Sequence, residues 1–94
     1  MLNKSVCVVG AGNWGKNHIR TLHELGNLGG IVESNKETLN HFAEKYPYAK
    51  GFLSLDEALM EENFLGFTIA TPAETHYKIA KTIMEAGKQV LVEK

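Results

Sequence analysis

The chain has 94 residues, of which 44% are hydrophobic and 22% charged, and its net charge is −1. A chain of this kind can bury one core without metals or disulfides, whereas two domains would not fit. Ten basic residues balance eleven acidic ones without a run of like charge, which argues against nucleic acid or a membrane as partner. The single cysteine excludes an internal disulfide, and the apolar run at 5–9 is too short for a signal peptide, so we expect a cytoplasmic protein.

Short runs rich in β-forming residues alternate with amphipathic windows, which is the pattern of parallel βαβ units. The predicted strands cover residues 5–9, 28–33, 49–53, 64–70 and 88–92. Four helices are predicted between the strands. The first begins within residues 10–15 and ends before Gly26, and the others cover about 36–46, 55–62 and 72–86. The first strand is apolar almost throughout, as expected where both faces of a parallel sheet are covered.

Residues suited to helix ends flank the predicted helices. Gly26 is suited to a C-terminal cap and Asn35 to an N-cap. Capping boxes are predicted at Ser54 and Thr71, with Pro72 at the first helical position. The apolar positions predicted to face the core are Ile19, Leu22 and Leu25 in the first helix, Leu39, Phe42, Ala43 and Tyr46 in the second, Leu55, Ala58 and Leu59 in the third, and Ala80, Ile83, Met84 and Gly87 in the fourth.

Five strands separated by helices predict an α/β fold, a doubly wound Rossmann-type parallel sheet in three layers. With right-handed crossovers, the expected strand order is 3-2-1-4-5. A closed α/β barrel would need far more chain. In such open sheets a ligand lies outside the carboxyl ends of the strands at the switch point, here between the first and fourth strands.

The segment V-V-G-A-G-N-W-G at residues 8–15 matches G-x-G-x-x-G after a strand and at the start of a helix. In this motif Gly10 allows a tight turn, Gly12 leaves room for a pyrophosphate, and Gly15 allows close packing of the helix on the strand. The amides of Gly12, Asn13 and Trp14 would bind the phosphates at the helix N-terminus. The alternative is that the glycines only make a tight strand-to-helix turn.

Glu33 lies eighteen residues beyond Gly15, at the end of the second predicted strand. A carboxylate at this place is typical of dinucleotide sites, where it binds the adenosine ribose hydroxyls. It would repel a 2′-phosphate, which favours NAD over NADP, although Ser34 and Lys36 keep NADP possible. The alternative for Glu33 is a solvated acid at the end of a strand.

The segment A-T-P-A-E-T-H at 70–76 follows the fourth strand, and Glu93-Lys94 follows the fifth. With the glycine loop, these motifs resemble the Gfo/Idh/MocA family of NAD(P)-dependent sugar and polyol oxidoreductases, in which an A-T-P-x-x-T-H segment and an E-K-P motif occur at similar intervals. The resemblance covers essentially the whole chain. More narrowly, G-N-W-G-K-N-H at 12–18 is similar to members that oxidise the 3-hydroxyl of UDP-N-acetylglucosaminuronic acid.

The resemblance implies roles for five residues in the second half. Thr71, Pro72 and His76 would line the pyrophosphate and nicotinamide-ribose side of the cofactor. Glu93 and Lys94 would lie beside the nicotinamide, with Lys94 contacting the substrate hydroxyl and assisting proton transfer as the catalytic residue. The alternatives are a surface or capping histidine at 76 and a solvated terminal lysine at 94.

The chain departs from the family pattern at its end, because the E-K-P motif stops before its proline. The resemblance implies a second domain, which supplies most of the substrate pocket, the catalytic histidine and usually a homo-oligomer interface. We expect this domain to be absent from the 94 residues. We therefore expect residues 1–94 to form a dinucleotide-binding domain that binds NAD without turning over a sugar. The competing hypothesis is a noncatalytic nucleotide- or CoA-binding module on the same fold.

Other residues that often carry chemistry are not assigned to a site. His18 and His23 are five residues apart and lack partners for a metal, so no metal site is predicted. Cys7 alternates inside a buried strand and is expected to act as a small hydrophobic residue. The Trp14 side chain would either pack over the ligand or shield the core.

Overall fold

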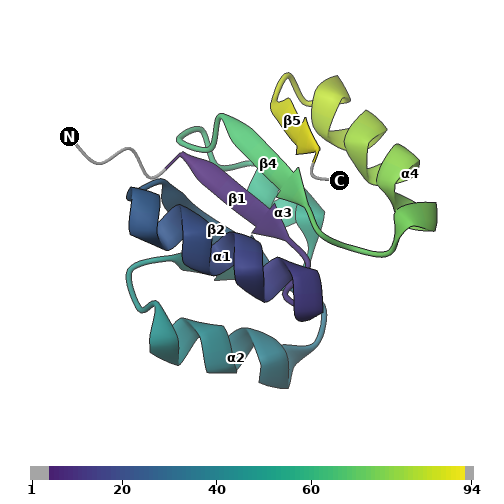
Figure 1. The fold of residues 1–94 in the computed structure, drawn as a ribbon. Coiled ribbons are helices and arrows are strands. Elements are labelled where there is room, and N and C mark those ends of the chain that lie inside the picture. Colours follow the sequence, from purple (N-terminus) through teal and green to yellow (C-terminus); the bar gives the residue numbers. More distant parts are fainter. Residues whose placement is uncertain (1–4, 93–94) are drawn as a thin grey trace.

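A computed structural model describes residues 5–92 and shows a five-stranded sheet with helices on both faces (Figure 1). The strands are β1 (Val6–Val9), β2 (Leu28–Val32), β3 (Lys50–Phe52), β4 (Gly66–Ile69) and β5 (Gln89–Val92). The helices are α1 (Asn13–Leu25), α2 (Lys36–Lys45), α3 (Leu55–Leu59) and α4 (Ala73–Glu85). None of these helices is both long enough and apolar enough to cross a membrane.

The sheet has the order β3-β2-β1-β4-β5, and every neighbouring pair is parallel. The predicted fold class and strand order are therefore confirmed. β1 lies at the centre, where Val9 is in register with Val32 of β2 and with Ile69 of β4. As a result, the segments that follow these three strands all leave the sheet at its carboxyl edge.

The sheet divides the core into two clusters, because successive side chains of a strand point to opposite faces. Toward α1 and α2 lie Val8, Ala11, Ile19, Leu28, Ile31, Leu39, Phe42 and Tyr46. Toward α3 and α4 lie Cys7, Val9, Val32, Ala58, Phe64, Phe67, Ile69 and Ile83. The three central strands β2, β1 and β4 are covered on both sides, which explains their nearly continuous apolar runs in the sequence.

Three of the predicted helix caps are confirmed. Gly26 ends α1 in the left-handed region with φ of +79°. The Asn35 side chain accepts the Thr38 N–H at 3.0 Å at the start of α2. At the start of α3, the Ser54 hydroxyl accepts the Glu57 N–H at 3.5 Å and donates to the Glu57 carboxylate at 3.1 Å.

The predicted capping box at Thr71 is wrong. Pro72 is itself the N-cap of α4, with φ of −54° and ψ of +146°, and no side chain caps this helix. The helix therefore begins one residue later than predicted, at Ala73. The Thr71 hydroxyl is bonded to the Thr75 hydroxyl instead, at 2.7 Å.

The predicted apolar faces are correct in their centres and wrong at four margins. Leu25 is 64% exposed and Met84 is 59% exposed, and Ala43 and Gly87 are exposed as well. Three residues along a helix turn it about 60° short of a full circle. Leu25 is two such steps beyond the buried Ile19, so the two side chains point about 120° apart. Only the narrow stripe that faces the sheet is covered.

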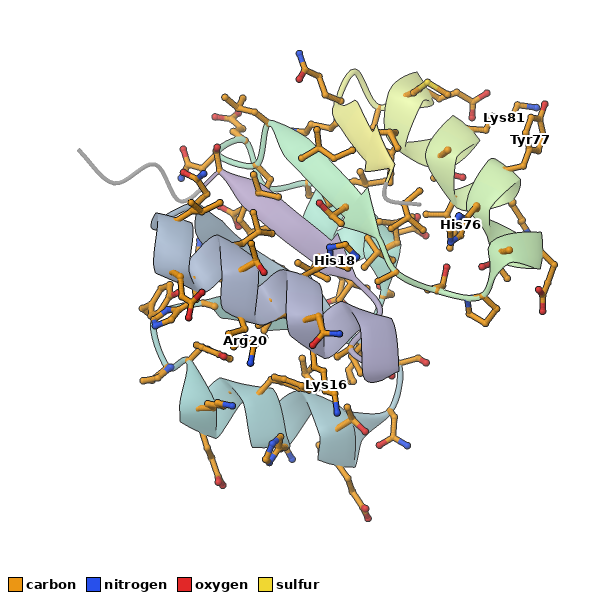
Figure 2. The ribbon with its side chains drawn as sticks, viewed as in Figure 1. Lys16, His18, Arg20, His76, Tyr77 and Lys81 are labelled. Carbon is orange, nitrogen blue, oxygen red and sulfur yellow. The ribbon has the colours of Figure 1, made fainter. Side chains whose placement is uncertain are left out.

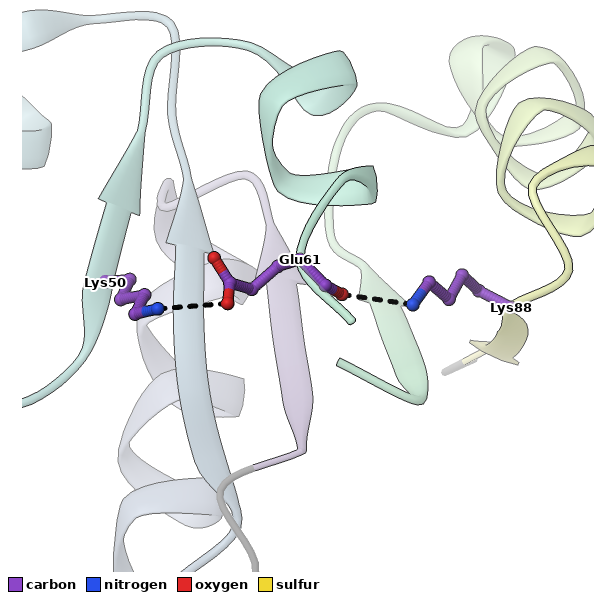
Figure 3. Close-up of polar contacts among 3 residues, drawn as sticks. All are labelled: Lys50, Glu61 and Lys88. Carbon is purple, nitrogen blue, oxygen red and sulfur yellow. Dashed lines mark hydrogen bonds and ion pairs between the residues drawn. The ribbon is translucent and has the colours of Figure 1, made fainter. Parts of the chain in front are cut away.

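Polar contacts at the amino edge of the sheet join three segments through Glu61 (Figure 3). Lys50 Nζ lies 3.0 Å from Glu61 Oε1, and Lys88 Nζ donates to the Glu61 carbonyl oxygen at 3.0 Å. Lys50 begins β3 and Lys88 directly precedes β5. These contacts hold the α3–β4 connection in place at the edge opposite to the carboxyl ends of the strands.

Candidate functional site

The predicted site residues that the structure describes gather at the carboxyl edge of the sheet. The glycine loop follows β1, Glu33 follows β2, and the 70–76 segment follows β4. The Gly10 N–H donates to the Val32 carbonyl at 2.8 Å, and the Ala70 N–H donates to the Val9 carbonyl at 2.9 Å. The three segments are thus tied together at the switch point of the sheet.

Gly10 makes the tight turn that the motif predicts, with φ of +98°. A Cβ at this position would lie 2.9 Å from Thr71 Cγ2 and 3.2 Å from the Ala70 carbonyl carbon. A side chain is therefore disfavoured by both the backbone conformation and the neighbouring segment. The glycine loop lies directly against the segment that follows β4.

Gly12 and Gly15 have different surroundings. A Cβ on Gly15 would overlap the carbonyl oxygen of Gly10, so this glycine allows the first turn of α1 to close onto the loop. A Cβ on Gly12 would meet no atom within 4 Å. Nothing in the fold requires a glycine at position 12, and the space beside it is open to a ligand.

The N-terminus of α1 is suited to an anion. Gly12 is its N-cap, no side chain caps it, and its first turn has no acidic residue. The Lys16 N–H donates to the Gly12 carbonyl at 2.9 Å, and the amides before it have no acceptor within the helix. These amides and the positive end of the helix dipole attract negative charge.

Glu33 is half-buried beneath the glycine loop. Its Oε1 accepts the Ala11 N–H at 2.9 Å, and its Oε2 accepts the Asn35 N–H at 2.8 Å. A carboxylate has about four lone-pair positions, so each oxygen retains one that can accept a hydroxyl. Sequence spacing places Glu33 at this edge, but the bond to Ala11 was not predicted.

The 70–76 segment is stabilised by its own side chains. Thr75 donates its hydroxyl to the Pro72 carbonyl at 2.7 Å, so the Thr71 hydroxyl must be the donor to Thr75. The His76 Nε2–H donates to the Thr71 carbonyl at 2.6 Å. In the neutral ring, this bond leaves Nδ1 as the acceptor.

The side chains of four predicted site residues are not described by the structure. Glu93 and Lys94 fall outside residues 5–92, although β5 ends at Val92, in register with Ile69 at the same edge. Asn13 and Trp14 contribute the backbone of the first turn of α1, and their side chains are not described.

The model of an oxidoreductase family, with the description "NAD-binding Rossmann fold", matches residues 4–94. The chain belongs to the Gfo/Idh/MocA oxidoreductase family. Among curated relatives, UDP-N-acetylglucosamine 3-dehydrogenase of Acidithiobacillus ferrooxidans is 30% identical over 94 residues, which are 100% of this chain and 29% of the relative. Inositol 2-dehydrogenase of Corynebacterium glutamicum is 29% identical over 92 residues, 95% of this chain and 27% of the relative.

Two solved structures share the fold of this chain. GenD2 from gentamicin A biosynthesis, in complex with NAD, has a TM-score of 0.90 and 33% identity over 100% of this chain and 27% of its own. The WlbA dehydrogenase from Bordetella pertussis, in complex with NADH and UDP-GlcNAcA, has a TM-score of 0.86 and 32% identity over 97% of this chain and 29% of its own. The chain thus spans less than a third of these relatives.

Outside the carboxyl edge, the part of this Gfo/Idh/MocA domain that the structure describes has neither an exposed thiol nor a cluster of metal-binding side chains. Cys7 is fully buried, and burial raises the pKa of its thiol, so a reactive thiolate does not form there. His23 Nδ1 lies 2.6 Å from the Tyr48 hydroxyl. Among residues 5–92, no group of three metal-binding side chains comes together.

Proposed function

We propose that this domain binds NAD in an oxidoreductase that transfers hydride from a secondary hydroxyl of a sugar or nucleotide sugar to the nicotinamide. The observation that carries the proposal is the Glu33 carboxylate bonded to Ala11 of the glycine loop, beside the open N-terminus of α1. This pairing fits a dinucleotide because the N-terminus of α1 would bind the phosphates and the Glu33 carboxylate would bind the ribose hydroxyls. The bound nicotinamide supplies the hydride chemistry, and the protein positions it.

Each motif has a separate task in this proposal. The amides of Gly12, Asn13 and Trp14 bind the pyrophosphate, and the free lone pairs of Glu33 accept the adenosine ribose hydroxyls. Thr71, Pro72 and His76 line the nicotinamide-ribose side. Glu93 and Lys94 lie beside the nicotinamide, where Lys94 holds the substrate hydroxyl and receives its proton.

NAD is preferred over NADP in this proposal because Glu33 would face a 2′-phosphate with its own negative charge. Both Glu33 oxygens already accept backbone N–H groups, so the carboxylate cannot turn away without leaving two donors unpaired. Ser34 follows Glu33 on the connection and Lys36 begins α2. Both are exposed, and they would favour NADP only if Glu33 were neutralised.

The substrate class rests on the relatives, which include dehydrogenases of UDP-N-acetylglucosamine and inositol. The substrate pocket belongs to a second domain, which this proposal places in the remaining part of a longer, homo-oligomeric enzyme. Residues 1–94 then form the dinucleotide-binding domain, which binds its cofactor and does not turn over a sugar by itself.

A titration of the 94-residue chain tests this proposal against a CoA-binding module. Trp14 is the single tryptophan, so its fluorescence follows the binding of NADH, NADPH and CoA. We expect saturation by NADH, weaker binding of NADPH, and no saturation by CoA. Saturation by CoA and by neither dinucleotide would replace the proposal with the CoA-binding alternative.

Glu33→Gln is expected to shift the cofactor preference. The amide can still accept one N–H but no longer repels a 2′-phosphate, so the ratio of NADPH to NADH affinity should rise about tenfold. The same titration measures both affinities, with Glu37→Gln on the exposed face of α2 as the control. An unchanged ratio would show that Glu33 does not face the 2′-position.

His76→Phe is expected to loosen the segment after β4. Loss of the bond to the Thr71 carbonyl should lower stability by about 1 kcal/mol and NADH affinity severalfold. His76→Gln retains an N–H donor and should restore much of both. Urea unfolding and the fluorescence titration measure the two effects, and full NADH affinity in the Phe variant would contradict a positioning role.

A further inference from the structure

A pocket of about 250 Å³ lies between α1 and α2, on the flanks of the two helices. Its lining includes Lys16 and Arg20 of α1 and His41 and Lys45 of α2, with Phe42 and Tyr46 behind them. In Figure 2, the Lys16 and Arg20 side chains extend from α1 toward α2. The pocket thus brings together basic groups from two helices that are separate in the sequence.

The basic groups of this pocket are arranged as two pairs. Lys16 and Arg20 are four residues apart on α1, and His41 and Lys45 are four residues apart on α2, so each pair shares one side of its helix. Like charges at this spacing repel each other and weaken the helix. Lys16 and Arg20 therefore repel each other at the pocket, and the Lys45 cation of α2 faces the same space.

No acidic side chain lines the pocket. The pocket lining contains neither Asp nor Glu, although Glu24, Glu37 and Glu44 lie on the same two helices. Within the part of the chain that the structure describes, the single ion pair is Lys50–Glu61, at the amino edge of the sheet. Among the described residues, no carboxylate therefore lies within 4.0 Å, the ion-pair distance, of a cation in the pocket.

The back of the pocket is apolar. Phe42 is 7% exposed and Tyr46 is 4% exposed, and both belong to the core cluster beneath α1 and α2. Apolar walls keep water from one side and strengthen the attraction of the exposed cations for an anion in front of them. The guanidinium of Arg20 presents paired N–H donors, which suit the geometry of phosphate oxygens.

We propose that the pocket between α1 and α2 binds the phosphate group of a small anion that is separate from the dinucleotide. The glycine loop binds phosphate through backbone amides at the start of α1. The pocket instead uses side chains along the flank of that helix and reaches Lys45 at the end of α2. This proposal does not depend on the proposed function of the carboxyl edge.

Pyrophosphate is the probe that tests this site. Its titration into the 94-residue chain, followed by NMR shifts of the His41 and Lys45 amides, should saturate. Arg20→Gln with Lys45→Gln should weaken this binding at least about tenfold, because two charge-assisted contacts are lost. The matched control is Lys78→Gln with Lys81→Gln on exposed positions of α4, which removes the same charge elsewhere.

The control should bind pyrophosphate within about twofold of the original chain, since distant charges are largely screened at physiological salt. Equal weakening in both double variants would overturn the proposal, because it would show attraction to overall charge. Absence of saturation in the original chain would also overturn it.

A second arm separates a free phosphate compound from the dinucleotide itself. With NADH at saturation, the pyrophosphate affinity at His41 and Lys45 should remain unchanged. Loss of pyrophosphate binding in the presence of NADH would assign the pocket to the dinucleotide and overturn the proposal of a separate site. The same conclusion would follow if the Arg20/Lys45 double variant lost affinity for NADPH but not for NADH.

Discussion

Gly12→Val is expected to abolish NADH binding while leaving the domain folded. A Cβ at Gly12 meets no protein atom within 4 Å, so the added side chain occupies only the open space beside the N-terminus of α1. That space is where the pyrophosphate would lie, and we expect affinity to fall at least about a hundredfold, or about 2.7 kcal/mol. Fluorescence titration measures the loss, and circular dichroism measures the fold.

The cost of Gly12→Val to stability should be small. Valine is a poorer N-cap than glycine, which lowers the free energy of unfolding by about 1 kcal/mol. Gly12→Ala, with a smaller side chain, should give an intermediate loss of NADH affinity at nearly the same stability. Unchanged NADH affinity in the Val variant would show that the loop serves the fold alone.

Gly15→Ala is expected to have the opposite effect and destabilise the fold. Glycine to alanine inside a helix ordinarily adds about 1 kcal/mol of stability. Here the new Cβ would overlap the Gly10 carbonyl oxygen, which is backbone and cannot rotate away, so α1 must shift from the loop. We expect a net loss of about 3 kcal/mol, as for an overpacked core.

Urea unfolding tests Gly15→Ala, with Gly66→Ala as the matched control. A Cβ at Gly66 would meet only the Leu91 side chain at 3.6 Å, an ordinary contact. The control should unfold within about 1 kcal/mol of the original chain, since strand positions disfavour glycine. A Gly15→Ala variant as stable as the original would mean that helix propensity, not the contact with Gly10, decides at this position.

The sheet could be predicted from the sequence because its causes are local. Each strand is short and apolar, each helix has a signal at one or both ends, and right-handed crossovers leave one common strand order. Gly10 and Gly15 were predicted for the same reason, since their constraint arises within the strand–turn–helix unit.

Features that depend on contacts between segments were not predictable in this way. Thr71 has the spacing of a capping box, but its hydroxyl is bonded to Thr75. The extended conformation of Pro72 makes the helix begin one residue later, at Ala73. The bond from Ala11 to Glu33 requires the position of one loop over another. The pocket requires the packing of α2 against α1, which no spacing within either helix reveals.

The proposed function requires that the carboxyl edge of the sheet binds NAD through the glycine loop and Glu33. Backbone NMR of the 94-residue chain with NADH tests it most directly. We expect the largest amide shifts at Ala11, Gly12, Gly15 and Asn35, with little change at Glu61 and Lys88 on the amino edge. Saturable binding with shifts confined to the amino edge or to the pocket between α1 and α2 would contradict it.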